Sequence, residues 1–530
     1  MKNYLLLWSA LGMFTFGANS QSNVELFKDI NQQGFSNPTD FVKYNNQFFF
    51  DATDGVHGNE LWRSDGTPAG TQMVRDIHLS GSSSPSSMMV SNGKLFFTAD
   101  NGTNGHELWV HNGTALGTFM VKDINPSGNA NISEMIDFDG KVFFNAESPN
   151  NGNQLWVSDG TLAGTNMLIN LPSGLPNGSS NPGQFTIADG KLFFTCQGDS
   201  DNWRKLWVTD GTTAGTTLVK SVNPSGQAFM QHFTVYNSKL YFSADDGTNG
   251  HEMWVSDGTS AGTHLFKDIH TTGSSVAASF KELNGILYFT AADDAGSVGI
   301  WKSNGTPSGT TLVHSLYQVG NGSVRGFSEF NGKLYFAANT GTDGVEPWVT
   351  DGTAAGTFML KNISLADDSY PDQYTVYNNK LYFTANTTFN NRELYETDGT
   401  TAGTFKIEPI NVTELNPCDI SATLFAYDNG LYFSASYTNS GAELYRIGDP
   451  ILGLETEEMS SFSVYPNPSN EEIVISSEIE SQFTLFDLTG KAVKTFEVHK
   501  SAKISISDLN AGIYILKANN SGTSMKILKN

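Results

Sequence analysis

Basic and thiol side chains are scarce in this sequence of 530 residues. It has 30 Lys and Arg against 54 Asp and Glu, a formal net charge of −24, and only two cysteines, Cys196 and Cys418. A surface this acidic repels phosphate backbones and anionic lipid, which argues against nucleic acid as a partner. The same charge suits divalent cations and basic partners, or solubility alone. Two cysteines are too few for a disulfide scaffold.

The sequence also lacks an apolar run long enough to span a bilayer. Its longest run, Tyr4 to Gly17, follows Lys2 and precedes Ala18-Asn19-Ser20, whose small residues suit a cleavage site before Gln21. We therefore expect a signal peptide over residues 1–20 and an exported mature chain without transmembrane helices.

Recognisable catalytic motifs are missing as well. The ten histidines are scattered, and no His-Glu-x-x-His, Gly-x-Ser-x-Gly or phosphate-binding loop occurs. The many carboxylates form no distinguishable pair of the kind that glycoside hydrolysis needs. The sequence therefore predicts no catalytic, cofactor-binding or metal-binding residues.

What the sequence has in abundance is one phrase, Glu-Leu-Trp-x-x-Asp-Gly-Thr-x-x-Gly-Thr, in degenerate copies. The Asp or Asn of the phrase recurs at Asp65, Asn112, Asp159, Asp210, Asp257, Asn304, Asp351 and Asp398. Subtracting neighbouring numbers gives steps of 47 residues, except for one step of 51. A ninth copy, Glu443-Leu444-Tyr445, lacks Asp-Gly-Thr. A period of this length indicates a repeat architecture.

Each unit contains four strand-like pieces, and Asn-Gly or Asp-Gly dipeptides, the strongest hairpin signals, join the first two. The second piece, for example residues 94–99, is apolar on both faces, which requires cover on both sides. An extra strand-like piece at residues 24–30 would complete the ninth unit and close a ring. We predict an all-β fold with a propeller of about nine four-stranded blades over residues 21–449. Because propellers typically have four to eight blades, an open array or two rings is the alternative.

The repeated residues are interpreted as structural. Asp and Asn cap turns through their side chains, and the amides of Asn112 and Asn304 are poor ligands for a hard cation. We expect turn caps and no cofactor, with bound calcium as the alternative. One tryptophan per unit at a fixed place suits packing between blades, whereas sugar stacking would require exposure.

Departures from the repeat are the better place to look for a ligand site. Unit four carries four extra residues, which we place near residues 199–204. The candidate ligand rim there is Asp201, Trp203 and Arg204, with neutral loop variation as the alternative. A longer connection, residues 409–418, marks unit nine. Cys196 and Cys418 fall on opposite sides of a nine-unit ring, so both are predicted to be free.

The repeat stops after residue 449. An acidic linker, residues 450–460, leads to strand-like runs over residues 461–530 that predict a small β-sandwich. The residues that carry its short motifs are Tyr465, Pro466, Asn467, Pro468, Asp487, Gly490, Lys491, Gly512 and Tyr514. These motifs resemble the type IX secretion system C-terminal sorting domain of Bacteroidota. The resemblance implies export by the type IX machinery through residues 461–530. The protein would be secreted or anchored on the outer membrane of a Gram-negative bacterium.

The nine units resemble the repeat family named after Glu-Leu-Trp-x-x-Asp-Gly-Thr, which brings no activity to transfer. Two main functions fit the sequence. The first is a non-catalytic scaffold for binding or adhesion, with a glycan or protein ligand. The second is a secreted glycan-active enzyme, a glycoside hydrolase or polysaccharide lyase built on a propeller. A purely structural coat protein is a third. The near-equal units favour binding or structure over catalysis.

Overall fold

The computed structural model contains two compact units, residues 1–449 and 450–530. It describes residues 24–114, 116–198, 203–317, 324–365, 367–388, 391–407, 423–428, 430–437, 441–448, 462–477, 481–488, 490–518 and 524–530. The predicted signal peptide and linker lie outside these ranges, as do Asp201, Cys418 and the connection at residues 409–418. Every regular element within them is a β-strand.

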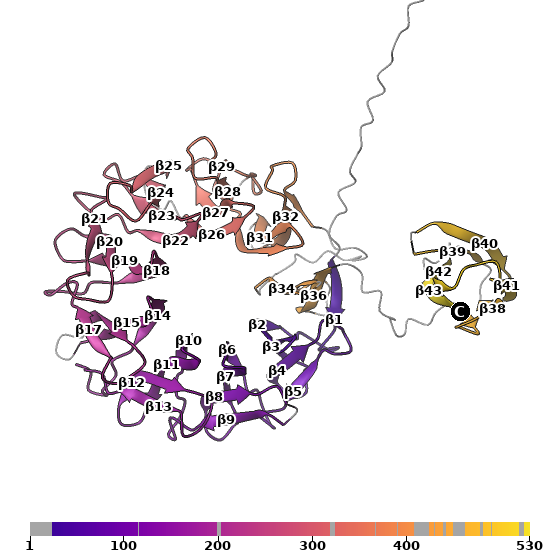
Figure 1. The fold of residues 1–530 in the computed structure, drawn as a ribbon, viewed down its shortest axis with the longest axis horizontal. Helices are drawn as coiled ribbons and strands as arrows, with labels where there is room; N and C mark the ends of the chain where they lie inside the picture. The colour runs from indigo at the N-terminus through magenta and orange to yellow at the C-terminus, as the bar shows by residue number, and fades with distance from the viewer. Residues whose placement is uncertain are drawn as a thin grey trace, which may run out of the picture. The chain divides into compact units, whose positions relative to one another are not determined.

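Nine four-stranded antiparallel sheets form the first unit, and Figure 1 shows them arranged as a ring. We number them blades 1 to 8 in chain order, each with four consecutive strands, and blade 9 combines three late strands with β1. The innermost strands are β2 (Thr39–Tyr44), β6 (Ser86–Ser91), β10 (Ser133–Phe138), β14 (Gly183–Ala188), β18 (Gln231–Tyr236), β22 (Ala278–Leu283), β26 (Arg325–Phe330), β30 (Asp372–Tyr377) and β34 (Phe425–Tyr427). The second strands are β3 (Gln47–Thr53), β7 (Lys94–Asp100), β11 (Lys141–Ser148), β15 (Lys191–Gln197), β19 (Lys239–Asp245), β23 (Ile286–Ala292), β27 (Lys333–Asn339), β31 (Lys380–Thr388) and β35 (Gly430–Ala435).

The third strands carry the Glu-Leu-Trp segments. They are β4 (Asn59–Ser64), β8 (His106–His111), β12 (Gly152–Ser158), β16 (Arg204–Thr209), β20 (His251–Ser256), β24 (Val298–Ser303), β28 (Val345–Thr350), β32 (Asn391–Thr397) and β36 (Glu443–Gly448). The outermost strands are β5 (Gln72–Arg75), β9 (Thr118–Lys122), β13 (Asn166–Ile169), β17 (Thr217–Lys220), β21 (His264–Lys267), β25 (Thr311–Tyr317), β29 (Phe358–Met359), β33 (Phe405–Lys406) and β1 (Val24–Lys28).

Face-to-face packing of the blades follows from the second strands, which are apolar on both sides. In β7, Leu95 and Phe97 pack toward blade 1, while Phe96 packs toward blade 3, and each is at most 1% exposed. Trp109 of blade 2 joins Leu61 of blade 1 in one cluster. The tryptophans are therefore wedges between blades, as the sequence predicts.

The ring closes through its two ends. β1 pairs with β36, Val24 opposite Ile447, so the N-terminal strand completes blade 9. On the other side of this blade, the Phe48 ring of blade 1 lies 4.6 Å from the ring of Tyr432. Blade 8 shares a core with blade 9 through Tyr382. The predicted nine-bladed propeller is confirmed, and the open array is wrong.

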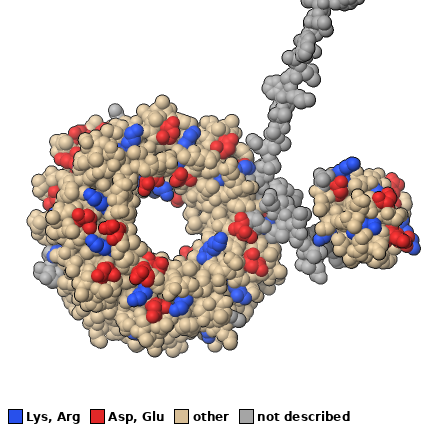
Figure 2. Space-filling model, viewed as in Figure 1, with Lys and Arg blue, Asp and Glu red and all other residues tan. Residues whose placement is uncertain are grey.

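Antiparallel pairing gives the ring two distinct faces. The start of the first strand and the end of the second lie at one end of each sheet, together with the connector from the preceding blade. We call this side the loop face. The Asn-Gly hairpins and the Asp-Gly-Thr turns lie on the opposite side, which we call the turn face. Between the two faces runs an open hole, with charged side chains around it (Figure 2).

The extra residues of unit four are placed differently from the sequence interpretation. Leu171 and Ile124 begin equivalent connectors, yet Leu171 to Gln184 spans 13 residues against 10 from Ile124 to Glu134. Three of the four extra residues therefore lie in the connector. Thr195 pairs with a residue 11 positions later, against 10 for the equivalent residue of blade 2, which places the fourth in the loop after β15.

The second unit is the predicted β-sandwich. Its sheets are β37 (Phe462–Tyr465), β38 (Glu472–Ser477) and β41 (Ser501–Ser505), and β40 (Ala492–Val498), β39 (Ser481–Phe486), β42 (Gly512–Ala518) and β43 (Ser524–Lys529). Both sheets contribute to one apolar core, with Ile473 and Ile475 from the first and Phe483, Leu485 and Leu516 from the second, all 0% exposed.

Candidate functional site

The Asp-Gly-Thr phrase builds a self-contained turn on the turn face. Asp257 Oδ1 accepts hydrogen bonds from Thr259 N at 2.9 Å and Thr259 Oγ1 at 2.7 Å, and these bonds lower the pKa of Asp257. Asn304 accepts the equivalent bonds at 3.1 and 2.7 Å. An amide thus does the same work as a carboxylate, which supports the interpretation of these residues as caps.

A hydroxyl pair that the sequence pattern does not reveal lies behind seven of the eight turns. Ser256 Oγ and Thr263 Oγ1 lie 2.6 Å apart in blade 5, joining the residue before the Asp to the last Thr of the phrase. In blade 2 the position belongs to His111, whose Nδ1 lies 2.8 Å from Thr118 Oγ1. Burial lowers the pKa of His111 to about 4. The turn face is therefore built from residues that bond to each other.

In blades 1, 2, 5, 7 and 9 the glutamate of the phrase holds the connector to the next blade, a role that the sequence pattern does not reveal. Glu60 is 0% exposed, and its carboxylate accepts hydrogen bonds from Ile77 N at 2.9 Å, Ser83 N at 3.1 Å and Ser83 Oγ at 2.6 Å. Burial raises the pKa of Glu60. In blade 2 the place of the serine is taken by Ala130, and burial raises the pKa of Glu107 to about 7.

Blade 3 replaces this glutamate with Gln154. Its Oε1 accepts from Leu171 N at 2.9 Å, and its Nε2 donates to Gly178 O at 2.8 Å. In blade 3 this buried position therefore supplies an acceptor for a connector amide without a charge, whereas blades 4 and 6 carry Lys205 and Gly299 there. No group of three or more His, Cys, Asp or Glu side chains that could hold a metal ion occurs in the ranges the structure describes.

Of the predicted ligand rim, only Trp203 and Arg204 are described. Arg204 Nη1 donates to Asn181 O at 2.9 Å and to Thr195 Oγ1 at 3.0 Å, and burial lowers the pKa of Arg204. This guanidinium thus braces the connector and second strand of its own blade. The nearby Cys196 is a buried free thiol, and burial raises its pKa.

A ring of strained residues lies on the loop face, where each connector approaches an innermost strand. One residue of each described connector, two positions before the innermost strand, has a φ of 43–48°, in the left-handed region. These rim residues are Asn37, Ser84, Asn131, Asn181, Phe229, Val276 and Tyr370. A positive φ is a strong outlier for β-branched or bulky residues, and none of the seven is glycine. The backbone shape is constant, while the side chain it presents changes from blade to blade.

A second strained ring lies just inside the first. The second residue of eight innermost strands has a φ of 52–67°, at an irregularity in pairing with the next strand. These bulge residues are Asp40, Ser87, Glu134, Gln184, His232, Ser279, Gly326 and Gln373. Some of them join neighbouring blades, since Glu134 Oε2 accepts from Gln184 N at 2.7 Å and Gln184 Nε2 donates to Met230 O at 2.7 Å. Bulges commonly redirect side chains beside functional sites.

The rim residues divide the loop face into two arcs. Those entering blades 1 to 4 are Asn or Ser, whereas Phe229, Val276 and Tyr370, entering blades 5, 6 and 8, are 59%, 45% and 44% exposed. The sequence holds a signal for this ring, because Asn37, Ser84 and Asn131 recur in steps of 47. The signal lies in the residues that vary at one position of the repeat, and not in the insertions.

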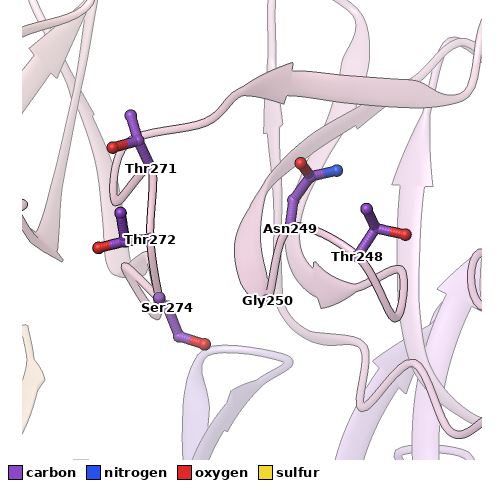
Figure 3. Close-up of a pocket in the computed structure, with 7 residues that line it drawn as sticks. Thr248, Asn249, Gly250, Thr271, Thr272 and Ser274 are labelled. Carbon is purple, nitrogen blue, oxygen red and sulfur yellow. The ribbon is translucent and has the colours of Figure 1, made fainter.

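A polar depression of about 330 Å³ lies farther out on the loop face. Its lining comes from the loop at residues 248–250 and the connector at residues 271–274, which face one another in Figure 3. Asp294 Oδ1 of blade 6 accepts from Thr271 N at 2.6 Å and secures this connector. Hydroxyl and amide groups of this kind suit hydrogen bonds to a polar ligand.

In the second unit, the predicted sorting motifs organise the edge of the sandwich. Asn467 Oδ1 accepts from Leu528 N at 2.8 Å and its Nδ2 donates to Lys526 O at 2.6 Å, which ties Tyr465-Pro466-Asn467-Pro468 to β43. Lys491 N donates to Asp487 Oδ1 at 3.1 Å, in the turn that contains Gly490 at a φ of 81°.

One further motif residue lies in the core of this unit. Tyr514, two positions after Gly512 on β42, is 8% exposed, and its hydroxyl donates to Asn510 O at 2.9 Å. Residues 463–530 match the protein family described as the secretion system C-terminal sorting domain. This unit is a type IX sorting domain. The chain is accordingly exported by the type IX system and is either released or held at the cell surface.

The comparisons for the ring concern its fold alone. A puromycin hydrolase matches 67% of this chain at 13% identity with a TM-score of 0.38, in its S511A mutant complexed with PGG. A prolyl endopeptidase matches 77% at 12% identity with a TM-score of 0.39. The matched regions span 58% and 56% of those chains, respectively. The β-propeller domain of the Trilobed protease from Pyrococcus furiosus, with its open velcro topology, matches 62% of this chain over 98% of its own length, at 13% identity and a TM-score of 0.34.

No curated protein sequence matches the chain. Within the described residues, no helix has the length and apolar character to cross a membrane.

Proposed function

We propose that the ring is a non-catalytic binding module that the type IX system delivers to the cell exterior, where it serves in adhesion. The rim of the hole on the loop face contacts an extracellular glycan. The observation that carries this proposal is the strain of the rim residues. A residue held at positive φ costs about 1–3 kcal/mol unless it is glycine. Seven connectors bear this cost and present seven exposed or half-exposed side chains at equivalent places.

The chemistry of the rim suits a sugar polymer. Exposed aromatic rings such as Phe229 and Tyr370 can pack on the apolar face of a sugar, and side-chain amides such as Asn37, Asn131 and Asn181 can bond to hydroxyls. The buried tryptophans cannot take this role, since Trp109 is only 5% exposed. The ligand surface therefore lies on the connectors, and the repeated phrase supports it from below.

The test is binding of the exported full-length chain to immobilised polysaccharides. We expect retention of at least one glycan and a clear loss of binding in the double variant Phe229→Gly, Tyr370→Gly. Leu116→Ala, at a 94% exposed residue in a turn of the turn face, is the matched control and should bind normally. Equal binding by all three proteins would place the ligand elsewhere.

A glycan-active enzyme is the second candidate, because the innermost strands carry exposed carboxylates around an open hole. Asp40, Glu134, Asp137, Glu282 and Glu329 lie on these strands. The same binding experiment discriminates the two functions when the retained polymer is sized afterwards. An unchanged polymer supports the binding module, whereas shortened chains or unsaturated ends support the enzyme.

A further inference from the structure

Blade 7 is the one described blade whose innermost strand has glycine at the bulge position. A Cβ placed on Gly326 would meet no other atom within 4 Å, so the missing side chain leaves open space. The flanking blades carry Ser279 and Gln373 at this position, with φ values of 52° and 59°. The ring of bulge residues therefore has a notch at blade 7.

An exposed cation borders the notch. Arg325 is the first residue of β26, and no hydrogen bond or ion pair engages its guanidinium within the described residues. Most other arginines of the ring donate hydrogen bonds, as Arg392 Nε does to Thr384 Oγ1 at 2.9 Å, whereas the buried Nε of Arg63 has no partner among the described residues. In a chain of net charge −24, a guanidinium left open to solvent at the hole is suited to an anionic ligand group.

A strained tyrosine is bonded to β28 of the same blade. Tyr370 has a φ of 44° and is 44% exposed, and its N–H donates to Val345 O at 3.1 Å. The neighbouring Asp368 carboxylate raises the pKa of Tyr370 by accepting a hydrogen bond from its hydroxyl, and Arg325 acts in the opposite direction. The strand pairing also places the two residues in one blade, because Val345 pairs with Asn339 of β27, two residues from Ala337, the partner of Arg325.

The nearby carboxylates have other partners. Asp368 Oδ1 accepts from Val345 N at 2.6 Å, and Asp372 Oδ2 lies 3.9 Å from Arg392 Nη2. Neither of these ion-pairs with Arg325 within the described part of the chain. The cation is thus available, although the adjacent acids reduce the attraction for an anion.

We propose that Arg325, Gly326 and Tyr370 form a subsite for an anionic sugar, a uronate or a sugar sulfate, within the glycan bound at the rim. This inference rests on the proposed glycan-binding function and names the class of sugar. The planar guanidinium pairs with carboxylate or sulfate oxygens through two parallel hydrogen bonds. The tyrosine ring packs on the sugar. The notch at Gly326 lets the acidic group of the sugar reach Arg325.

The experiment measures binding of the full-length chain to polygalacturonate, chondroitin sulfate and neutral dextran. Gly326→Gln fills the notch with the side chain that blades 4 and 8 carry at the same strained position, so the backbone tolerates it. Arg325→Gln removes the charge alone. We expect each variant to bind one or both acidic polymers at least tenfold more weakly. Ser279→Gln makes a matched change in blade 6 and should leave binding unchanged.

The outcomes separate this subsite from the proposed function. Binding of dextran as well as acidic polymers, unchanged in both variants, overturns the subsite and keeps the glycan-binding rim. No binding of any glycan by the wild-type chain overturns both. The chain could instead bind no glycan but capture a peptide through its C-terminal carboxylate, with that binding lost in Arg325→Gln. This outcome overturns the sugar ligand and shows a protein ligand. Should Gly326→Gln melt at a lower temperature than wild type, Arg325→Gln alone decides.

Discussion

The two faces of the ring use their conserved backbone shape for opposite purposes. On the turn face, constant side chains such as Asp257 and Thr263 bond within their own turn and leave little to offer a ligand. On the loop face, the connectors keep a strained backbone and vary the side chain, from Asn37 to Phe229 and Tyr370. The difference is that the side chains that vary between blades are exposed on the loop face, whereas those of the repeated motif are used within their own turns.

The largest expected effect concerns Glu107, the buried glutamate that holds a connector of the loop face. Glu107→Ala leaves the buried N–H groups of Ile124 and Asn125 without their acceptor. Unpaired buried donors are costly, so we expect a loss of about 3 kcal/mol in the free energy of unfolding, measured by chemical denaturation at pH 6. A smaller loss than that of a surface alanine substitution would contradict the role assigned to this carboxylate.

Glu107→Gln is the matched control, because Gln154 fills this position in blade 3. The pKa of Glu107 is raised from 4.5 to about 7, so its contribution to stability is complete below pH 4.5 and is lost as the pH rises through 7. The glutamine variant should therefore gain about 3 kcal/mol relative to wild type between pH 4.5 and 8.5.

His111 gives the turn face of the same blade the opposite pH dependence. Its pKa is lowered from 6.5 to about 4, so its contribution is complete above pH 6.5 and is lost as the pH falls toward 4. His111→Ser restores the hydroxyl found in blade 1, and we expect it to remove an acid sensitivity of up to about 3 kcal/mol. Thermal melting of both proteins at pH 7.5 and pH 4 measures this difference. An equal fall in melting temperature in wild type and variant would contradict the prediction.

A cap on the turn face should matter for stability and not for binding. Asp257→Ala removes the acceptor for Thr259 N and Oγ1, and loss of such a cap costs about 1 kcal/mol. Asp257→Asn should be nearly neutral, since Asn304 forms the same turn. Denaturation and glycan binding are measured on the same samples. A change in glycan binding would contradict the assignment of binding to the loop face alone.

The smallest expected effect is the most telling, because it has the opposite sign. Val276→Gly relieves a β-branched residue at a φ of 47° and should raise the free energy of unfolding by up to about 1 kcal/mol. It also removes an exposed apolar side chain from the rim, so glycan binding should weaken. A drop in stability would mean that the valine packs usefully and that the strain argument fails at this connector.

The fold can be predicted from the sequence because it depends on turn residues and on apolar side chains that must be covered. Asn-Gly hairpins such as Asn92-Gly93 set the turns, the apolar Leu95-Phe96-Phe97 run requires cover on both faces, and the spare strand near Val24 demands a partner. The caps are readable for the same reason, since an Asx turn involves only its own residues. The hairpins, the doubly apolar strand and the turn caps can each be predicted from one unit, and the number of units then predicts the number of blades.

The candidate site is harder to read because it depends on backbone conformation. Nothing in the letters Val, Phe or Tyr announces a positive φ, and the role of Glu60 needs a partner, Ser83, that lies 23 residues away. The sequence predicts the insertion of unit four near residues 199–204, whereas most of it lies in the connector at residues 171–184. The rim residues are found in the sequence when residues at equivalent positions of the nine units are compared.

The closing strand has a mechanical consequence. A tether attached beyond Gly448 would pull on β36, which lies between β35 and β1 in the interior of its sheet. The buried Arg446 side chain donates through Nε to Glu25 Oε1 at 3.0 Å, and Glu443 Oε2 accepts from Ile30 N at 2.8 Å, so side chains reinforce the ladder to the N-terminal strand. Force from that end must break two ladders together, whereas an edge strand would peel from one. A ring sealed by its own first strand is thereby suited to hold under load.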